Sequence, residues 1–139
     1  MEPLLKTPHS IQVFEQITVG AVVASIAIFI YQNMTTKLFG PTAPIHVATY
    51  VIINLVLIFT ITKAKSIVSR AFYTFITGFA IVFSVCALFG ITLLVPIKLP
   101  AGGAAFLFLY IMVAVASLYL LYAPSTTKWL HSEEPVTAD

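Results

Sequence analysis

The sequence has few charged residues and a single cysteine. Only 9% of its 139 residues are Asp, Glu, Lys or Arg, whereas about 25% is typical of soluble domains. The formal net charge of +2 is too small for the basic surface that binds nucleic-acid phosphates, so no nucleic-acid partner is expected. Because Cys86 is the only cysteine, an internal disulfide and a cysteine-rich zinc site are excluded.

Acidic residues are missing from most of the chain. Residues 16–132 contain neither Asp nor Glu. Proton relays, divalent-cation sites and cation-selective pores in membranes generally use carboxylates. The sequence therefore argues against paired-carboxylate catalysis and a metal-activated water. Its three histidines are too scattered to hold a haem, and we expect neither a cofactor nor a metal.

Apolar residues dominate what is present, at 60% of the chain with a mean hydropathy of +1.03. A membrane-spanning helix needs about 20 predominantly apolar residues. Four segments meet this length, namely residues 13–31, 44–62, 71–95 and 102–122. The first is the weakest, because Glu15 and Gln16 lie in its opening turn, and a signal peptide is the alternative interpretation there.

The connections between these segments are short, so consecutive helices should be antiparallel neighbours. The predicted fold is an all-α integral membrane protein: a four-transmembrane-helix up-down bundle in the lipid bilayer. We expect one membrane domain over residues 1–139 with a polar tail at 125–139. Tyr31, Tyr122 and Trp129 lie at segment ends, where aromatic residues favour the membrane interface. No feature assigns the chain to the endoplasmic reticulum or to another particular membrane.

Basic residues predict the orientation of the bundle. With four spans, Lys6, Lys63, Lys65, Arg70 and Lys128 lie on the side of the termini, and two other lysines lie opposite. The positive-inside rule then places both termini in the cytoplasm.

Small and polar residues inside the segments are candidate helix-packing or partner contacts. Helices in lipid associate through close packing of small residues and through polar side chains. Serine and threonine side chains usually bond to their own helix backbone, whereas an unpaired amide such as that of Asn54 is costly in hydrocarbon. The candidates are Gly20, Ala24, Asn54, Ala80, Ser84 and Gly90.

Glu15 and His46 form a separate class of candidate interfacial polar sites. Glu15 is expected to pair with Lys63, Lys65 or Arg70, with a functional contact to a partner or polar ligand as the alternative. His46 opens the second segment and is expected to be a hydrogen-bonded interfacial residue, or else a ligand contact or pH sensor.

A short pattern resembles one family of lipid-modifying accessory proteins. Leu88-Phe89-Gly90, followed by the run from Phe106-Leu107-Phe108 to Trp129-Leu130, resembles the middle of the accessory subunits that help add ethanolamine phosphate to GPI anchors. The resemblance spans residues 88–130, lacks the Ala-Pro that follows the glycine in that family, and implies a role in GPI-anchor biosynthesis.

Two broader functions fit the residues. The first is a non-catalytic subunit that packs by its helix faces in a hetero-oligomeric membrane complex and stabilises or positions a partner. The second is a small oligomeric transporter or channel for a neutral or anionic solute, with Asn54, the intramembrane hydroxyl groups and His46 as candidates to line its path.

Overall fold

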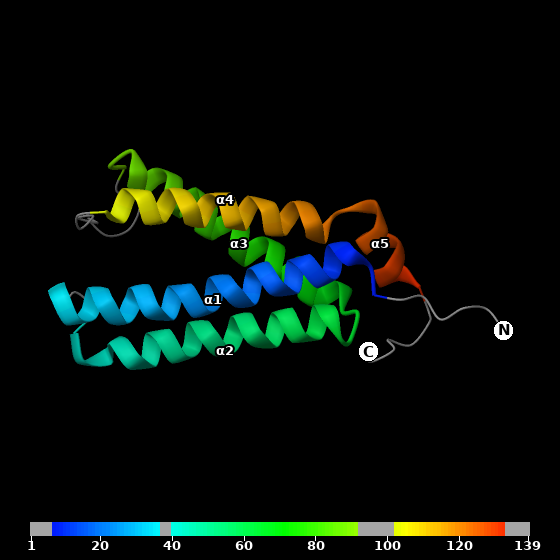
Figure 1. Ribbon diagram of the computed structural model, residues 1–139, viewed down its shortest axis with the longest axis horizontal. Coiled ribbons are helices and arrows are strands. Elements are labelled where there is room, and N and C mark those ends of the chain that lie inside the picture. The colour runs from blue at the N-terminus through cyan, green and yellow to red at the C-terminus, as the bar shows by residue number, and fades with distance from the viewer. Residues whose placement is uncertain (1–6, 37–39, 92–101, 133–139) are drawn as a thin grey trace.

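The computed structural model describes residues 7–36, 40–91 and 102–132, and within these ranges the chain is helical with no strand (Figure 1). Four helices are long and apolar enough to cross a membrane, which confirms the predicted class of all-helical membrane bundle. The elements are α1 (His9–Thr36), the short 3₁₀ helix η1 (Gly40–Thr42), α2 (Ala43–Thr62), α3 (Ile67–Leu88), α4 (Gly103–Leu121) and α5 (Pro124–His131).

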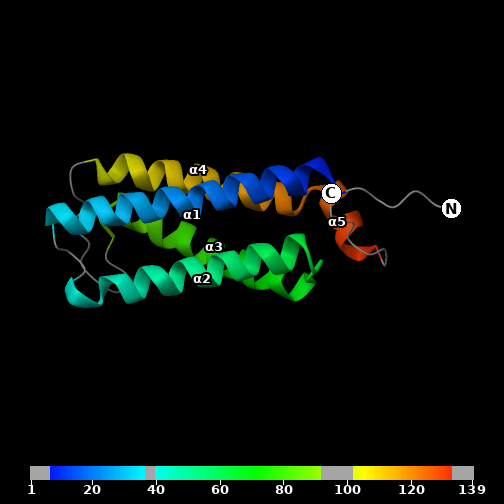
Figure 2. The ribbon, with the colours of Figure 1, turned by 60° about the horizontal axis from the view of Figure 1, so that its bottom comes forward.

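The four long helices form a ring of neighbours. Helix α1 contacts α2 and α4, and α3 contacts the same two helices. The two views show the helices running side by side, with α5 lying across one end of the bundle (Figures 1 and 2). The start of α1 and the α2–α3 connection lie at this end as well, which we call the α5 end.

Local sequence accounts for the helix boundaries. Pro44 lies in the first turn of α2, where a missing N–H costs nothing. The Ser66 side chain accepts a hydrogen bond from the Ser69 N–H at 3.1 Å and caps the start of α3, so this helix begins before the predicted residue 71. Pro124 opens α5 in the same way as Pro44 opens α2.

Gly90 ends α3 earlier than the predicted residue 95. Its φ of +69° lies in the left-handed region that glycine adopts without strain. The Gly90 N–H donates to the Ala87 carbonyl at 3.2 Å, and the Ile91 N–H donates to the Cys86 carbonyl at 2.8 Å. These two bonds form a Schellman motif, which satisfies carbonyls left open at a helix end.

Side-chain hydroxyl groups within the helices largely bond to their own backbone, as predicted. Thr18 Oγ1 donates to the Phe14 carbonyl at 2.6 Å, and Ser25 Oγ donates to the Ala21 carbonyl at 2.7 Å. Such bonds satisfy a hydroxyl group inside hydrocarbon without a second helix.

The apolar core lies toward the α5 end of the bundle. Phe14, Ile61 and Leu121 are fully buried there, together with Ile58 and Tyr73. The Phe14 and Tyr73 rings meet edge to face, with centroids 5.3 Å apart, a favoured aromatic arrangement. Every long helix thus contributes at least one residue to this cluster.

Helix α5 differs from the predicted polar tail at 125–139. Its Trp129 and Leu130 pack against Ile11 of α1 as a second buried cluster, and Thr126 bonds to Ser10 at 2.7 Å. Trp129 is only 2% exposed, so its ring is covered by protein; its position at the membrane interface stays a prediction. The remaining tail, residues 133–139, lies outside the described residues.

Candidate functional site

Polar side chains from all four long helices converge on a small cavity inside the bundle. Its volume is about 30 Å³, enough for a single water molecule. Seven of its lining residues carry polar groups: Thr18 of α1, Tyr50 and Asn54 of α2, Tyr73 and Thr77 of α3, and Tyr110 and Ser117 of α4. We call this space the central cavity.

Hydrogen bonds hold part of this lining in place. The hydroxyl groups of Tyr73 and Ser117 lie 3.1 Å apart, and Ser117 also donates to the Ala114 carbonyl at 2.7 Å. Asn54 Nδ2 donates to the Tyr50 carbonyl at 2.9 Å. None of the lining residues is charged, so the central cavity is a neutral hydrogen-bonding site.

A larger crevice opens beside the central cavity, among α2, α3 and α4. It has a volume of about 470 Å³, and we call it the lateral crevice. Tyr50 and Tyr110 line both spaces, so the crevice reaches the rim of the central cavity. Its walls are mostly apolar and consist of Tyr50, Phe79, Ala80, Phe83, Ser84, Leu107 and Tyr110.

A third space lies between α1 and α2 at the end of the bundle opposite α5. It has a volume of about 350 Å³ and is lined by Ser25, Ile26, Phe29, His46, Val47 and Tyr50. His46, which the sequence predicts to be an interfacial residue, is exposed and lines this mostly apolar cleft. The lateral crevice and this cleft both lie away from the dense core at the α5 end.

The structure separates the candidate packing residues into different environments. Asn54 lines the central cavity, whereas Ala80 and Ser84 line the lateral crevice. Gly20 and Ala24 lie on an exposed face of α1, which none of the other described helices covers. The helix-ending conformation of Gly90 accounts for that glycine without a packing contact.

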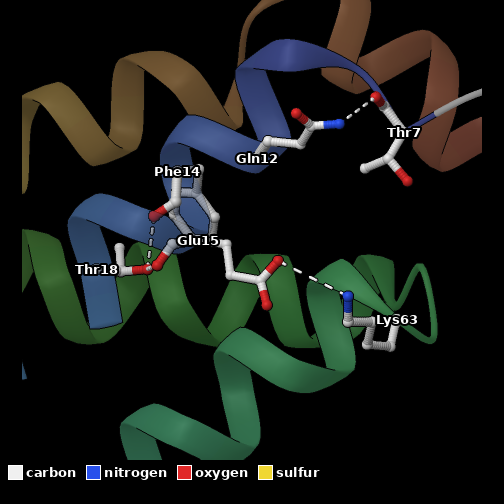
Figure 3. Close-up of polar contacts among 6 residues, drawn as sticks. All are labelled: Thr7, Gln12, Phe14, Glu15, Thr18 and Lys63. Carbon is white, nitrogen blue, oxygen red and sulfur yellow. Dashed lines mark hydrogen bonds and ion pairs between the residues drawn. The ribbon is translucent and has the colours of Figure 1, made fainter. Parts of the chain in front are cut away.

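Glu15 pairs with Lys63, one of the three cations that the sequence analysis considered (Figure 3). Glu15 Oε2 and Lys63 Nζ are 3.8 Å apart, and the two side chains are 38% and 53% exposed. The pair links the start of α1 to the end of α2. Lys65 instead donates to Ser132 Oγ at 2.8 Å and lies 5.0 Å from the Trp129 ring centroid.

Arg70 is buried at the α5 end, a position that the sequence analysis did not foresee. It is 7% exposed, and its guanidinium carbon lies 3.9 Å from the centroid of the Tyr122 ring. Its Nη2 donates to Thr127 Oγ1 at 3.2 Å. Arg70 therefore joins α3 to the end of α4 through the cation–π contact with Tyr122 and to α5 through the hydrogen bond to Thr127.

Sequence reasoning also missed the tyrosines of the central cavity. Tyr50 and Asn54 lie four residues apart on α2, and Tyr73 and Thr77 lie four apart on α3. Residues four apart share one helix face. This repeated spacing of polar groups in apolar helices is the signal that could have identified the site.

Chemically, the described residues form a helical bundle with a neutral polar centre. Within residues 7–36, 40–91 and 102–132, no three His, Cys, Asp or Glu side chains come close enough to hold a metal ion. Comparison with protein-family models, curated proteins and solved structures found no match for this chain. The proposals that follow therefore rest on the geometry alone.

Proposed function

We propose that this protein is a non-catalytic subunit of a membrane complex, which docks on a partner helix through one face of α1. The observation that carries the proposal is an uncovered row of residues four apart: Gln12, Gln16, Gly20 and Ala24 are all exposed. These residues share one side of the helix, and the other helices of the chain pack elsewhere on α1.

The composition of this face suits a helix rather than lipid tails. Small residues let two backbones approach closely, and a glutamine amide bonds across a helix contact. A β-carbon added at Gly20 would meet no atom of another described helix within 4 Å, so packing among the described helices does not require this glycine. Glycine also lowers helix stability by about 1 kcal/mol relative to alanine, and a partner in close contact would offset that loss.

Gly20→Leu tests this docking face. The substitution should leave the isolated bundle folded, because the space beside Gly20 is open, but its side chain should block the partner. The measurement is native mass after gentle extraction from the source membrane, with identification of co-migrating polypeptides. We expect a large wild-type particle with unrelated subunits and at least a tenfold loss of those subunits in the variant.

The matched control is Ala105→Leu, which enlarges an exposed residue of α4 and should keep the complex. A wild-type particle that contains this chain alone would overturn the proposal. So would a Gly20→Leu variant that retains its partners at wild-type levels.

The central cavity favours a second candidate function, transport of a neutral solute by an oligomer of this chain. Asn54 lines that cavity, and Ser84 lines the adjacent lateral crevice, which is open to the surface of the bundle. Under this proposal Asn54→Leu should abolish solute flux into reconstituted vesicles while assembly stays intact. Under the subunit proposal, wild-type vesicles should show no flux above protein-free vesicles.

We further infer that the α5 end faces the cytoplasm, with both termini. Lys63, Lys65, Arg70 and Lys128 all lie at this end, consistent with the positive-inside rule. Lys6, Lys37 and Lys98 lie outside the described residues. Labelling of a Ser125→Cys, Cys86→Ala chain by a membrane-impermeant maleimide tests the inference: reaction in sealed cells without permeabilisation would contradict it.

A further inference from the structure

We propose that the central cavity binds one water molecule, which is held by Thr18 of α1, Asn54 of α2 and Tyr73 of α3 and links these helices inside the bundle. The site is separate from the α1 docking face, so the proposal goes beyond the subunit function and does not depend on it. It assigns the polar lining of the cavity a structural role that is distinct from solute transport.

The size and the wall of the central cavity suit water. Its volume of about 30 Å³ admits a water molecule but neither an acyl chain nor a larger solute. Polar atoms form a substantial part of its wall, whereas the walls of the lateral crevice and of the cleft between α1 and α2 are almost wholly apolar. Apolar cavities stay dry, and a cavity with polar partners holds water, so the central cavity is the hydrated one of these three spaces.

The hydrogen bonds already formed around the cavity show which groups remain available. A hydroxyl group has one proton to donate and two lone pairs that accept. Thr18 donates its proton to the Phe14 carbonyl at 2.6 Å, and Ser117 donates its proton to the Ala114 carbonyl at 2.7 Å. Tyr73 must therefore be the donor in its 3.1 Å contact with Ser117. The hydroxyl oxygens of Thr18 and Tyr73 are left as acceptors, so the molecule that binds here has to donate hydrogen bonds.

Asn54 supplies the complementary group. Its side-chain nitrogen carries two N–H groups, one of which donates to the Tyr50 carbonyl at 2.9 Å. In the part of the chain that the structure describes, the other N–H and the Oδ1 atom form no hydrogen bond. A water molecule can accept from this N–H and donate to Thr18 and Tyr73, which gives it about three hydrogen bonds, as is typical of buried water. The water thereby removes the cost of an amide group without a partner in hydrocarbon.

The neutral lining distinguishes water from a metal cation. Hard cations also bind oxygen atoms, but none of the lining residues of the central cavity is charged. A cation in this site would lose its hydration without gaining a counter-charge. Water carries no net charge, so it enters the cavity without that cost.

Magic-angle-spinning NMR of the full chain in phosphatidylcholine bilayers tests the site. The chain is labelled with ¹⁵N, and polarisation is transferred from water protons to nitrogen. We expect transfer to Asn54 Nδ2 to be at least fivefold stronger than transfer to the backbone nitrogen of Ile53. This neighbour lies at nearly the same depth in α2, and its side chain is exposed on the outside of the bundle.

Ala114→Val should displace the water. Ala114 is buried and lines the cavity, so the added methyl groups should occupy its space and reduce the transfer to Asn54 at least fivefold. Ala105→Val is the matched control, because Ala105 is exposed on the same helix and lies outside the cavity lining; it should keep the wild-type transfer. Thr18→Val is the second variant, should Ala114→Val fail to fold. It keeps the size of the side chain, removes one acceptor and should weaken the transfer at least twofold.

Three results would overturn the proposal. These are wild-type transfer to Asn54 no stronger than to Ile53, transfer that disappears when choline replaces sodium ions, and unchanged transfer in folded Ala114→Val and Thr18→Val. The second result would assign the cavity to a hydrated cation. Loss of the α1 partner in the Gly20→Leu experiment would not alter any of these readouts, so the two proposals fail independently.

Discussion

The two ends of the bundle are built differently. At the α5 end, all four long helices contribute to a tight core around Phe14, Tyr73 and Leu121, and α5 covers it. Toward the opposite end, the helices separate around the cleft and the lateral crevice, with volumes of about 350 and 470 Å³. The comparison shows that dense packing fixes one end of the bundle, whereas the helices leave open grooves toward the other.

The largest expected effect comes from removing an aromatic ring from the dense end. Phe14 is fully buried, so Phe14→Ala should lower the free energy of unfolding by about 3 kcal/mol through lost packing. Phe79 is a matched control in the lateral crevice, where it is 59% exposed, and Phe79→Ala should cost less than about 1 kcal/mol. Unfolding by sodium dodecyl sulfate in mixed micelles measures both. Equal losses would show that the two ends do not differ in packing.

Disconnecting α5 should have an intermediate effect, confined to the α5 end. Arg70→Leu removes the contact with Tyr122 and the hydrogen bond to Thr127. Amide exchange in residues 124–131 should accelerate about tenfold, because exchange there reports local opening. Arg70→Lys is the comparison, since lysine keeps the charge but lacks the planar guanidinium that stacks on a ring. Unchanged exchange in Arg70→Leu would mean that the other contacts of α5, chiefly those of Trp129, Leu130 and Thr126, are sufficient to hold it.

The smallest effect is expected at the Glu15–Lys63 pair. Both side chains are partly exposed and their charged atoms are 3.8 Å apart, so Glu15→Gln should change the free energy of unfolding by less than about 0.5 kcal/mol. Lys63→Gln should give a similar value, and the double variant should match the singles. A loss above about 1 kcal/mol would indicate a stronger role for this carboxylate than an exposed ion pair supplies.

Much of the helix pattern follows from sequence alone. Long uncharged apolar runs predict four spans because hydrocarbon tolerates only backbones that satisfy their own hydrogen bonds. Pro44 marks a helix start for a local reason that acts within one turn, whereas Pro124 was interpreted only as the end of the fourth span. Ser66 and Gly90 act equally locally, but their cap and Schellman motif were recognised only in the structure.

The residues that line the central cavity were less predictable from the sequence than the helices were, and helix α5 was not predicted. Asn54 could be singled out because an amide is rare in an apolar segment, but its companions Tyr50, Tyr73 and Tyr110 are ordinary components of such segments. The sequence left Lys63, Lys65 and Arg70 as possible partners of Glu15, and the structure shows its ion pair with Lys63. Trp129 was assigned to the interface because aromatics favour it, and the structure adds that contacts with Ile11 bury it.

By itself, then, the sequence determined that this chain forms apolar helices of membrane-spanning length and where several of them begin. Only the tertiary structure decided which side of each helix faces inward, where α5 docks and that one end of the bundle stays open. The physical reason is that lipid and protein core are similarly apolar. Hydropathy therefore reports how long a helix is, but packing and hydrogen bonds between distant residues decide which faces meet.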